Sequence, residues 1–67
     1  MKLTLKAARV NKNLTQREAG SLLHVSKDVV SNWERGKSYP SIKKIPEIER
    51  LYSVRYDDLI FLPNNTA

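Results

Sequence analysis

A short polar stretch in the middle of the chain carries side chains of the kinds that read DNA bases. If residues 27–35 form a helix, its turn of about 100° per residue gathers five polar side chains on one side: Lys27, Asp28, Ser31, Asn32 and Arg35. In a major groove an amide can pair with adenine, an ammonium group with guanine, and a carboxylate with the cytosine amino group. An ordinary solvated helix face has the same composition, so this face alone leaves both interpretations open.

The sequence around this stretch has the signals of two helices joined by a tight turn. Thr15 and Glu18 fit a capping box, in which a hydroxyl and a carboxylate bond the free N–H groups at a helix start. Ser26 is an N-cap candidate for the second helix, and Gly36 is typical of a helix end. Because only a few residues around His24 separate the helices, the pattern predicts a helix-turn-helix.

The charge is distributed unevenly along the chain. Residues 1–44 hold ten Lys/Arg and three Asp/Glu, whereas residues 45–67 hold two Lys/Arg and four Asp/Glu, for a net charge of +5. A basic surface on one side suits a polyanion, because Lys and Arg neutralise phosphates and release counterions. Charge alone is a modest signal, since a basic domain can simply be soluble.

The length and composition predict one small cytoplasmic domain. The chain has 67 residues and no cysteine, so helix packing, with help from dimerisation, must stabilise a small core. No apolar run approaches the ~20 residues that cross a bilayer, and no signal peptide is recognisable. His24 is the single histidine, which leaves no partner for a metal or catalytic site.

Apolar residues at helical spacing predict four further helices, over 2–12, 16–23, 42–52 and 56–61. Pro46 predicts an irregular turn at 42–45 and a regular helix after it, because proline is tolerated only in a first turn. The polar residues 63–67 are expected to fray. No strand pattern competes with the helices.

The same spacing predicts which residues meet in the core. Trp33 and Val30 share the apolar face of the 27–35 helix, and Leu22 and Ile42 belong to the apolar stripes of the helices that contain them. Gly20 is costly inside a helix, so we expect the 27–35 helix to approach it closely.

Several motifs spread along the chain occur together in one known family. They are Arg9, Leu14-Thr15-Gln16-x-Glu18, Ser26 to Glu34 with Trp33, Gly36-Lys37, Pro40-Ser41, and Val54 to Ile60. With these motifs the chain resembles the Cro/repressor-type (xenobiotic-response-element) helix-turn-helix family over about residues 3–60. The resemblance implies an all-α, compact five-helix bundle of the lambda-repressor-like type, with a DNA-binding domain over 1–62 and a short polar tail over 63–67. It also implies a transcriptional regulator that binds palindromic operators as a dimer.

The resemblance assigns roles to individual residues. Lys27, Asp28 and Asn32 match base-reading positions, and Ser31 shares their face. Arg9 and Glu34 match a pair that ties the first helix to the third, a structural role that they share with Trp33. Phosphate contacts are predicted at matching or neighbouring polar positions: Gln16, Arg17, Ser26, Arg35, Lys37, Tyr39 and Lys43.

Five positions depart from the family pattern, and two of them are Gly20, where alanine is usual, and Asp28, which is an uncommon base reader. His24 stands where glycine is common, so the turn must accommodate a Cβ. Arg55 replaces a usual capping residue before the last helix. Glu49 replaces a small apolar residue, so it is expected to be solvated or paired with a base.

We therefore expect a sequence-specific regulator of double-stranded DNA, most simply a small Cro-like repressor. One recognition helix reads only about four or five base pairs, so a homodimer is expected at least on DNA, through the 56–61 helix with Phe61 and Leu62. The alternative is an antitoxin-like protein-interaction module that regulates its own gene, although residues 63–67 are too few to wrap a partner. No cofactor, metal, catalytic residue, membrane or small-molecule ligand is expected.

Overall fold

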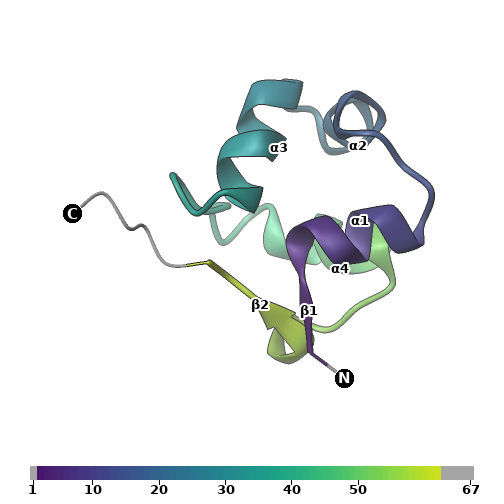
Figure 1. The fold of residues 1–67 in the computed structure, drawn as a ribbon, viewed down its shortest axis with the longest axis vertical. Helices are drawn as coiled ribbons and strands as arrows, with labels where there is room; N and C mark the ends of the chain where they lie inside the picture. The colour runs from purple at the N-terminus through teal and green to yellow at the C-terminus, as the bar shows by residue number, and fades with distance from the viewer. Residues whose placement is uncertain (1, 63–67) are drawn as a thin grey trace.

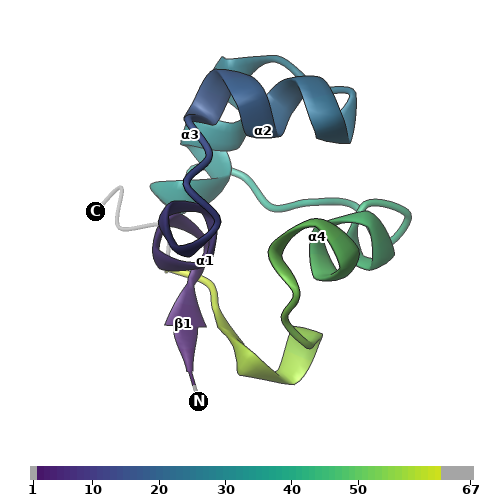
Figure 2. The ribbon, with the colours of Figure 1, turned by 90° about the vertical axis from the view of Figure 1, so that its right-hand side faces the viewer.

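The computed structural model describes residues 2–62, and the helix-turn-helix forms one end of the molecule. Helices α2 (Gln16–Leu23) and α3 (Lys27–Glu34) lie at the top of Figures 1 and 2, above α1 (Leu5–Asn11) and α4 (Ile45–Tyr52). The opposite end holds a 3-10 turn, η1 (Tyr56–Asp58), and the short strands β1 (Leu3–Thr4) and β2 (Leu59–Ile60). The predicted tail over 63–67 lies outside the described residues.

Hydroxyl side chains begin three of the helices. The Thr4, Thr15 and Ser26 hydroxyl oxygens each accept a hydrogen bond from the N–H three residues further on, at 3.0–3.2 Å. The Glu18 carboxylate also accepts the Thr15 N–H at 2.8 Å, which confirms the capping box. Because Thr4 caps α1, this helix begins three residues later than the predicted span of 2–12.

Left-handed residues end the α-helices of the described chain. Asn13, His24, Gly36 and Ser53 have φ between 54° and 76°. In each case the N–H of the following residue donates to a carbonyl oxygen five positions earlier: Leu14 to Arg9, Val25 to Gly20, Lys37 to Asn32 and Val54 to Glu49. This bond satisfies a carbonyl group left free at a helix end, and it confirms the predicted stop at Gly36.

The predicted fifth helix over 56–61 is wrong. This segment forms one 3-10 turn and then β2, which pairs in parallel with β1, Leu3 opposite Leu59 and Thr4 opposite Ile60. The hydrogen-bonding partners of β2 come from the other end of the chain, so no local spacing shows them. Residues 2–62 therefore form four α-helices with a small strand pair, and not the five helices predicted.

Glu49 supplies the cap that η1 otherwise lacks. Arg55 stands at the N-cap position and makes no side-chain capping bond. The Glu49 carboxylate, reaching from α4, accepts the Tyr56 N–H at 2.7 Å. The two departures from the family pattern, at Glu49 and Arg55, thus compensate one another.

The core lies where the four helices meet. Its buried apolar residues are Leu5, Ala8, Ala19, Leu23, Val30, Trp33, Ile48, Tyr52 and Leu59. The burial of Val30 and Trp33 confirms the predicted rotation of α3 about its axis. The predictions for Leu22 and Ile42 are wrong, since these side chains are 56% and 88% exposed. Ile42 lies in the turns before α4, which begins at Ile45, so it does not share that helix's apolar face.

Gly20 is the site of a close backbone approach, but its neighbour is the turn that follows α2 and not helix α3. A Cβ at Gly20 would lie 2.6 Å from the Val25 carbonyl oxygen and 3.2 Å from the Ser26 carbonyl. The missing side chain lets the chain fold back over α2, which keeps the turn between α2 and α3 short.

The helices of the described residues are short. None of the four α-helices within residues 2–62 exceeds eight residues, so none is long enough to cross a membrane.

Candidate nucleic-acid interface

Helix α3 presents the predicted base-reading side chains on one surface. Val30 and Trp33 fasten its inner side to the core, so its outer side is fixed. On that outer side Lys27 and Asp28 are exposed, while Ser31 and Asn32 are half-buried. These four side chains bring together an ammonium group, a carboxylate, a hydroxyl and an amide, which suffice to recognise base edges.

The residues predicted to bind phosphate lie around α3 rather than on one element. Arg17, Lys37 and Lys43 are exposed on α2 and on the segment between α3 and α4. Ser26 uses its hydroxyl oxygen to accept the N–H of Val29, and the hydroxyl proton of a serine in this position can be donated to another group. This surface combines cations and donors at the two ends of α3, as a contact with a DNA backbone requires.

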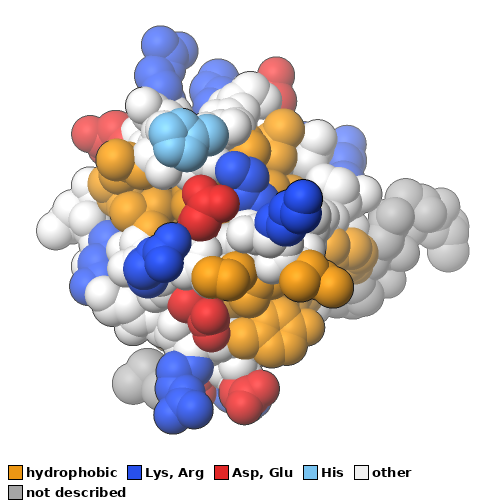
Figure 3. Space-filling model, turned by 180° about the vertical axis from the view of Figure 1, so that it is seen from behind, with side chains coloured by type: hydrophobic (Ala, Val, Ile, Leu, Met, Phe, Trp, Pro, Cys, Tyr) orange, Lys and Arg blue, Asp and Glu red, His pale blue; other side chains and the backbone are white. Residues whose placement is uncertain are grey.

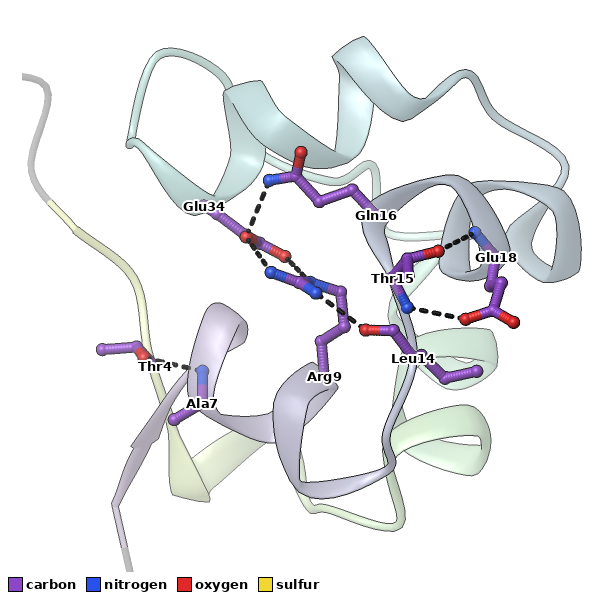
Figure 4. Close-up of polar contacts among 8 residues, drawn as sticks. All are labelled: Thr4, Ala7, Arg9, Leu14, Thr15, Gln16, Glu18 and Glu34. Carbon is purple, nitrogen blue, oxygen red and sulfur yellow. Dashed lines mark hydrogen bonds and ion pairs between the residues drawn. The ribbon is translucent and has the colours of Figure 1, made fainter.

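Gln16, at the first position of α2, is tied to α3 through Glu34. Its amide Nε2 donates to the Glu34 carboxylate at 3.1 Å (Figure 4). One of the two amide protons is used in this bond, and the other can be given to a phosphate. This hydrogen bond therefore holds the beginning of α2 against the end of α3.

A buried ion pair connects this contact to α1. Arg9 donates from Nε and Nη2 to the Glu34 carboxylate at 2.6 and 3.1 Å, and from Nη1 to the Leu14 carbonyl at 2.7 Å (Figure 4). Both side chains are almost fully buried. The bond to Glu34 raises the pKa of the Arg9 guanidinium above its ordinary value, although burial opposes this effect, so the group stays charged.

Asn32 and Arg35 contact each other on the exposed side of α3. The Arg35 guanidinium donates from Nη2 to the Asn32 amide oxygen at 3.0 Å. The pair joins a predicted base reader to a predicted phosphate contact. The sequence shows both residues but not the bond between them.

Tyr39 is directed toward the C-terminal segment. Its hydroxyl donates to the Leu62 carbonyl at 2.8 Å, and its ring meets Phe61 edge-on with the ring centres 6.3 Å apart. A tyrosine hydroxyl has a single proton, so a phosphate contact would require the bond to Leu62 to be exchanged.

Lys44 has a positioning role that the sequence analysis did not identify. Its ammonium group donates to the Leu23 carbonyl, at the end of α2, at 2.6 Å, and lies 3.6 Å from the Glu47 carboxylate. The bond fastens the beginning of α4 to the end of α2. Because 21 residues separate Lys44 from Leu23, no local pattern could have revealed it.

An apolar groove of about 560 Å³ lies beside the loop that follows α3. It is lined by Tyr39, Pro40, Ile42, Ile45, Pro46, Tyr56 and Phe61. The face turned away in Figure 1 shows hydrophobic side chains with both basic and acidic side chains around them (Figure 3). The segment over 56–61, where a dimer contact was predicted, forms η1, β2 and part of the groove lining instead of a helix, and the dimer contact stays a prediction.

Comparison with known proteins gives a family and one relative. The helix-turn-helix family model matches residues 5–59. The HTH-type transcriptional activator BcrR of Enterococcus faecalis is 39% identical over 56 residues, which are 84% of this chain. The chain spans only 28% of that protein's length. No solved structure matches. With the helix-turn-helix geometry and the family match over most of its length, the chain belongs to the Cro/C1-type helix-turn-helix family of DNA-binding transcriptional regulators.

Proposed function

We propose that this chain binds double-stranded DNA at a specific operator, with α3 in the major groove. The observation that carries the proposal is the outer side of α3, where Lys27, Asp28, Ser31 and Asn32 lie together on a helix that is capped, packed and braced. A helix held in this way keeps its base-reading side chains in one register. The exposed Arg17, Lys37 and Lys43 contribute the backbone contacts.

The proposed regulation is repression, in which the bound protein occupies the promoter. A protein bound over a promoter blocks transcription with its DNA-binding surface alone, and the residues proposed for that surface lie within residues 2–62. Activation requires a further contact with the transcription machinery. A reporter gene behind the selected operator tests this part, because expression should fall when the protein is produced, whereas a rise would assign activation, as in the name of the relative.

The experiment for sequence-specific binding combines selection of DNA from random sequence with two variants. Asn32→Ala should weaken binding to the selected site by ~1–3 kcal/mol and binding to random DNA very little. Lys37→Ala should weaken both by similar factors and reduce the slope of log K against log salt by about one unit. Arg55→Ala, which removes a charge at the opposite end of the molecule, is the matched control. An Asn32→Ala variant with unchanged sequence preference would overturn the assignment of α3 as the reading helix.

The proposal includes a homodimer on a palindromic operator. A single recognition helix reads too few base pairs to find one site in a genome, and two copies on one side of the duplex double the reading. The groove supports a second copy as partner, because its lining is uncharged and exposes Ile42 almost fully. Basic and acidic side chains flank the hydrophobic ones in Figure 3, which suits a two-fold contact that pairs unlike charges.

Footprinting tests the dimer. The wild-type protein should protect two half-sites about one helical turn, roughly 34 Å, apart. Ile42→Glu should reduce the protected region to one half-site at moderate protein concentration. Val10→Glu, at a half-exposed apolar position outside the groove, is the control and should leave both half-sites protected. An Ile42→Glu protein that still protects both half-sites would place the dimer contact elsewhere.

A further inference from the structure

The hydrogen bond between Arg35 and Asn32 determines which groups Asn32 can offer to DNA. Arginine has only donors, so the atom of Asn32 that meets Arg35 Nη2 at 3.0 Å must be the amide oxygen. The amide nitrogen then points away from the guanidinium, and no acceptor for its two protons is found among residues 2–62. The groups of the pair that can still donate are therefore N–H groups, and the amide oxygen keeps one lone pair beside the guanidinium.

A pair that offers mainly donors discriminates between the purines. Guanine presents two acceptors in the major groove, N7 and O6, whereas adenine presents one acceptor, N7, and the N6 amino donor. The bidentate contact of asparagine with adenine needs the amide oxygen as acceptor for N6. Here that oxygen already accepts from the Arg35 guanidinium, so the N6 donor of adenine would have to bond to the second lone pair beside a cation.

Polarisation acts in the same direction. A charge-assisted hydrogen bond to the amide oxygen withdraws electron density from the amide and makes its N–H groups stronger donors. Arg35 is exposed and Asn32 half-buried, so the bond is only moderately stable in water. It becomes stronger when bound DNA excludes the water around it.

We propose, resting on the proposed function, that Arg35 is a specificity-determining residue, which holds Asn32 as a donor and directs it to guanine. Arg35 is then a positioning residue for base recognition, in addition to any contact with phosphate. The base expected opposite Asn32 changes from adenine, the usual partner of a free amide, to guanine. Without the guanidinium the amide is free to turn and pair with adenine.

The experiment compares DNA selected from random sequence by the wild-type protein and by three variants. Asn32→Ala identifies the position that Asn32 reads, as the position where the preference disappears. The wild type should select guanine there. Arg35→Met keeps the aliphatic stem and removes the donors, and it should shift the preference at that position toward adenine by about fivefold or more, with the other positions unchanged. Arg17→Met removes an exposed arginine on α2 and should weaken all sequences equally.

Modified bases supply a second readout. Replacing the guanine by 7-deazaguanine removes the N7 acceptor and should weaken wild-type binding by about fivefold or more, whereas inosine keeps N7 and O6 and should bind like guanine. A wild-type preference for adenine at this position, or an Arg35→Met variant with a uniform loss and an unchanged preference, would overturn the inference. Failure of the proposed function looks different, since the wild type would then select no sequence at all.

Discussion

At the scale of single residues, hydrogen bonds to the Glu34 carboxylate hold α3 against α1 and α2. The carboxylate accepts two hydrogen bonds from Arg9 and one from Gln16, so one side chain joins α1, α2 and α3. Both charges of the ion pair are buried, and charges in that environment are tolerated only when they are paired and hydrogen-bonded. This one carboxylate therefore helps to fix the orientation of α3 relative to the beginning of α2.

Removing Arg9 should be far more costly than replacing the whole pair. Arg9→Ala leaves the buried Glu34 charge uncompensated, so the free energy of unfolding, measured by urea titration, should fall by ~3–5 kcal/mol. The double variant Arg9→Met with Glu34→Leu should lose much less, because apolar side chains of similar size need no partner. Gln16→Ala, which keeps the ion pair, should cost about 1 kcal/mol. If Arg9→Ala is no less stable than Gln16→Ala, the pair does not hold the helices.

Tyr52 makes the free energy of unfolding depend on pH in the alkaline range. Burial, with a further contribution from the Glu34 charge, raises the pKa of Tyr52 to about 12, although Arg9 opposes the shift. Between about pH 10 and 12 the unfolded state has lost the phenolic proton and the folded state keeps it. The unfolded state then binds fewer protons, so stability from this group is present below about pH 10 and is lost as pH rises to 12.

The test compares the wild type with Tyr52→Phe, which cannot ionise. Between about pH 10 and 12 the wild type should lose unfolding free energy relative to Tyr52→Phe, by at most about 1.4 kcal/mol per pH unit. Tyr56→Phe, at a half-exposed ring, serves as the control. Parallel pH profiles for wild type and Tyr52→Phe would contradict the role of Tyr52.

At the scale of elements, the turn between α2 and α3 sets the geometry of the helix pair. His24 has φ of 61°, and the residues that follow it fold back over Gly20. The missing Cβ of Gly20 leaves room for the Val25 carbonyl. The left-handed backbone is strained for a residue with a Cβ, whereas the close approach at Gly20 is accommodated by glycine. The turn therefore carries strain at one residue only.

His24→Gly should stabilise the protein. A left-handed backbone at a residue with a Cβ costs ~1–2 kcal/mol, which glycine removes. Glycine also increases the entropy of the unfolded chain, which lowers the stability by ~0.4–1 kcal/mol. The net increase in unfolding free energy should be up to about 1 kcal/mol, seen as a higher melting temperature by circular dichroism. Ser21→Gly, an exposed position inside α2, should instead destabilise by a few tenths to about 1 kcal/mol. A lower melting temperature for His24→Gly would show that the imidazole contributes to folding.

At the scale of the whole molecule, one small core holds four helices and the strand pair together. Trp33 is the largest buried side chain, and it extends from the helix that presents the base-reading residues. The same side chain therefore contributes to the core and orients the proposed DNA-binding face. A domain of this size has a total stability of only about 3–5 kcal/mol, so a single core change can remove most of it.

Trp33→Ala should leave the protein largely unfolded at 25 °C. Truncating a buried large aromatic residue costs ~3–5 kcal/mol, which circular dichroism and urea titration can measure. Val10→Ala, at a half-exposed position of α1, should change the stability by less than about 0.5 kcal/mol. A folded Trp33→Ala protein with a near-native melting temperature would mean that the core does not depend on this ring.

The sequence by itself determined the elements whose signals are local. The capping box of Thr15 and Glu18, the cap at Ser26 and the stop at Gly36 act within a few residues, and they predicted α2 and α3 almost to the residue. Helical periodicity likewise predicted that Trp33 and Val30 face inward. The base-reading positions followed from the same rotation and from the family resemblance, and their roles remain predictions.

Only the tertiary structure decided the features that depend on residues far apart in the chain. The pairing of β1 with β2 replaced a predicted helix, because backbone groups at 59–60 find partners at 3–4. The bond from Lys44 to Leu23 joins segments 21 residues apart, and the exposure of Ile42 depends on where α4 begins. Local signals fix where helices start and stop, whereas long-range contacts emerge only when the helices pack.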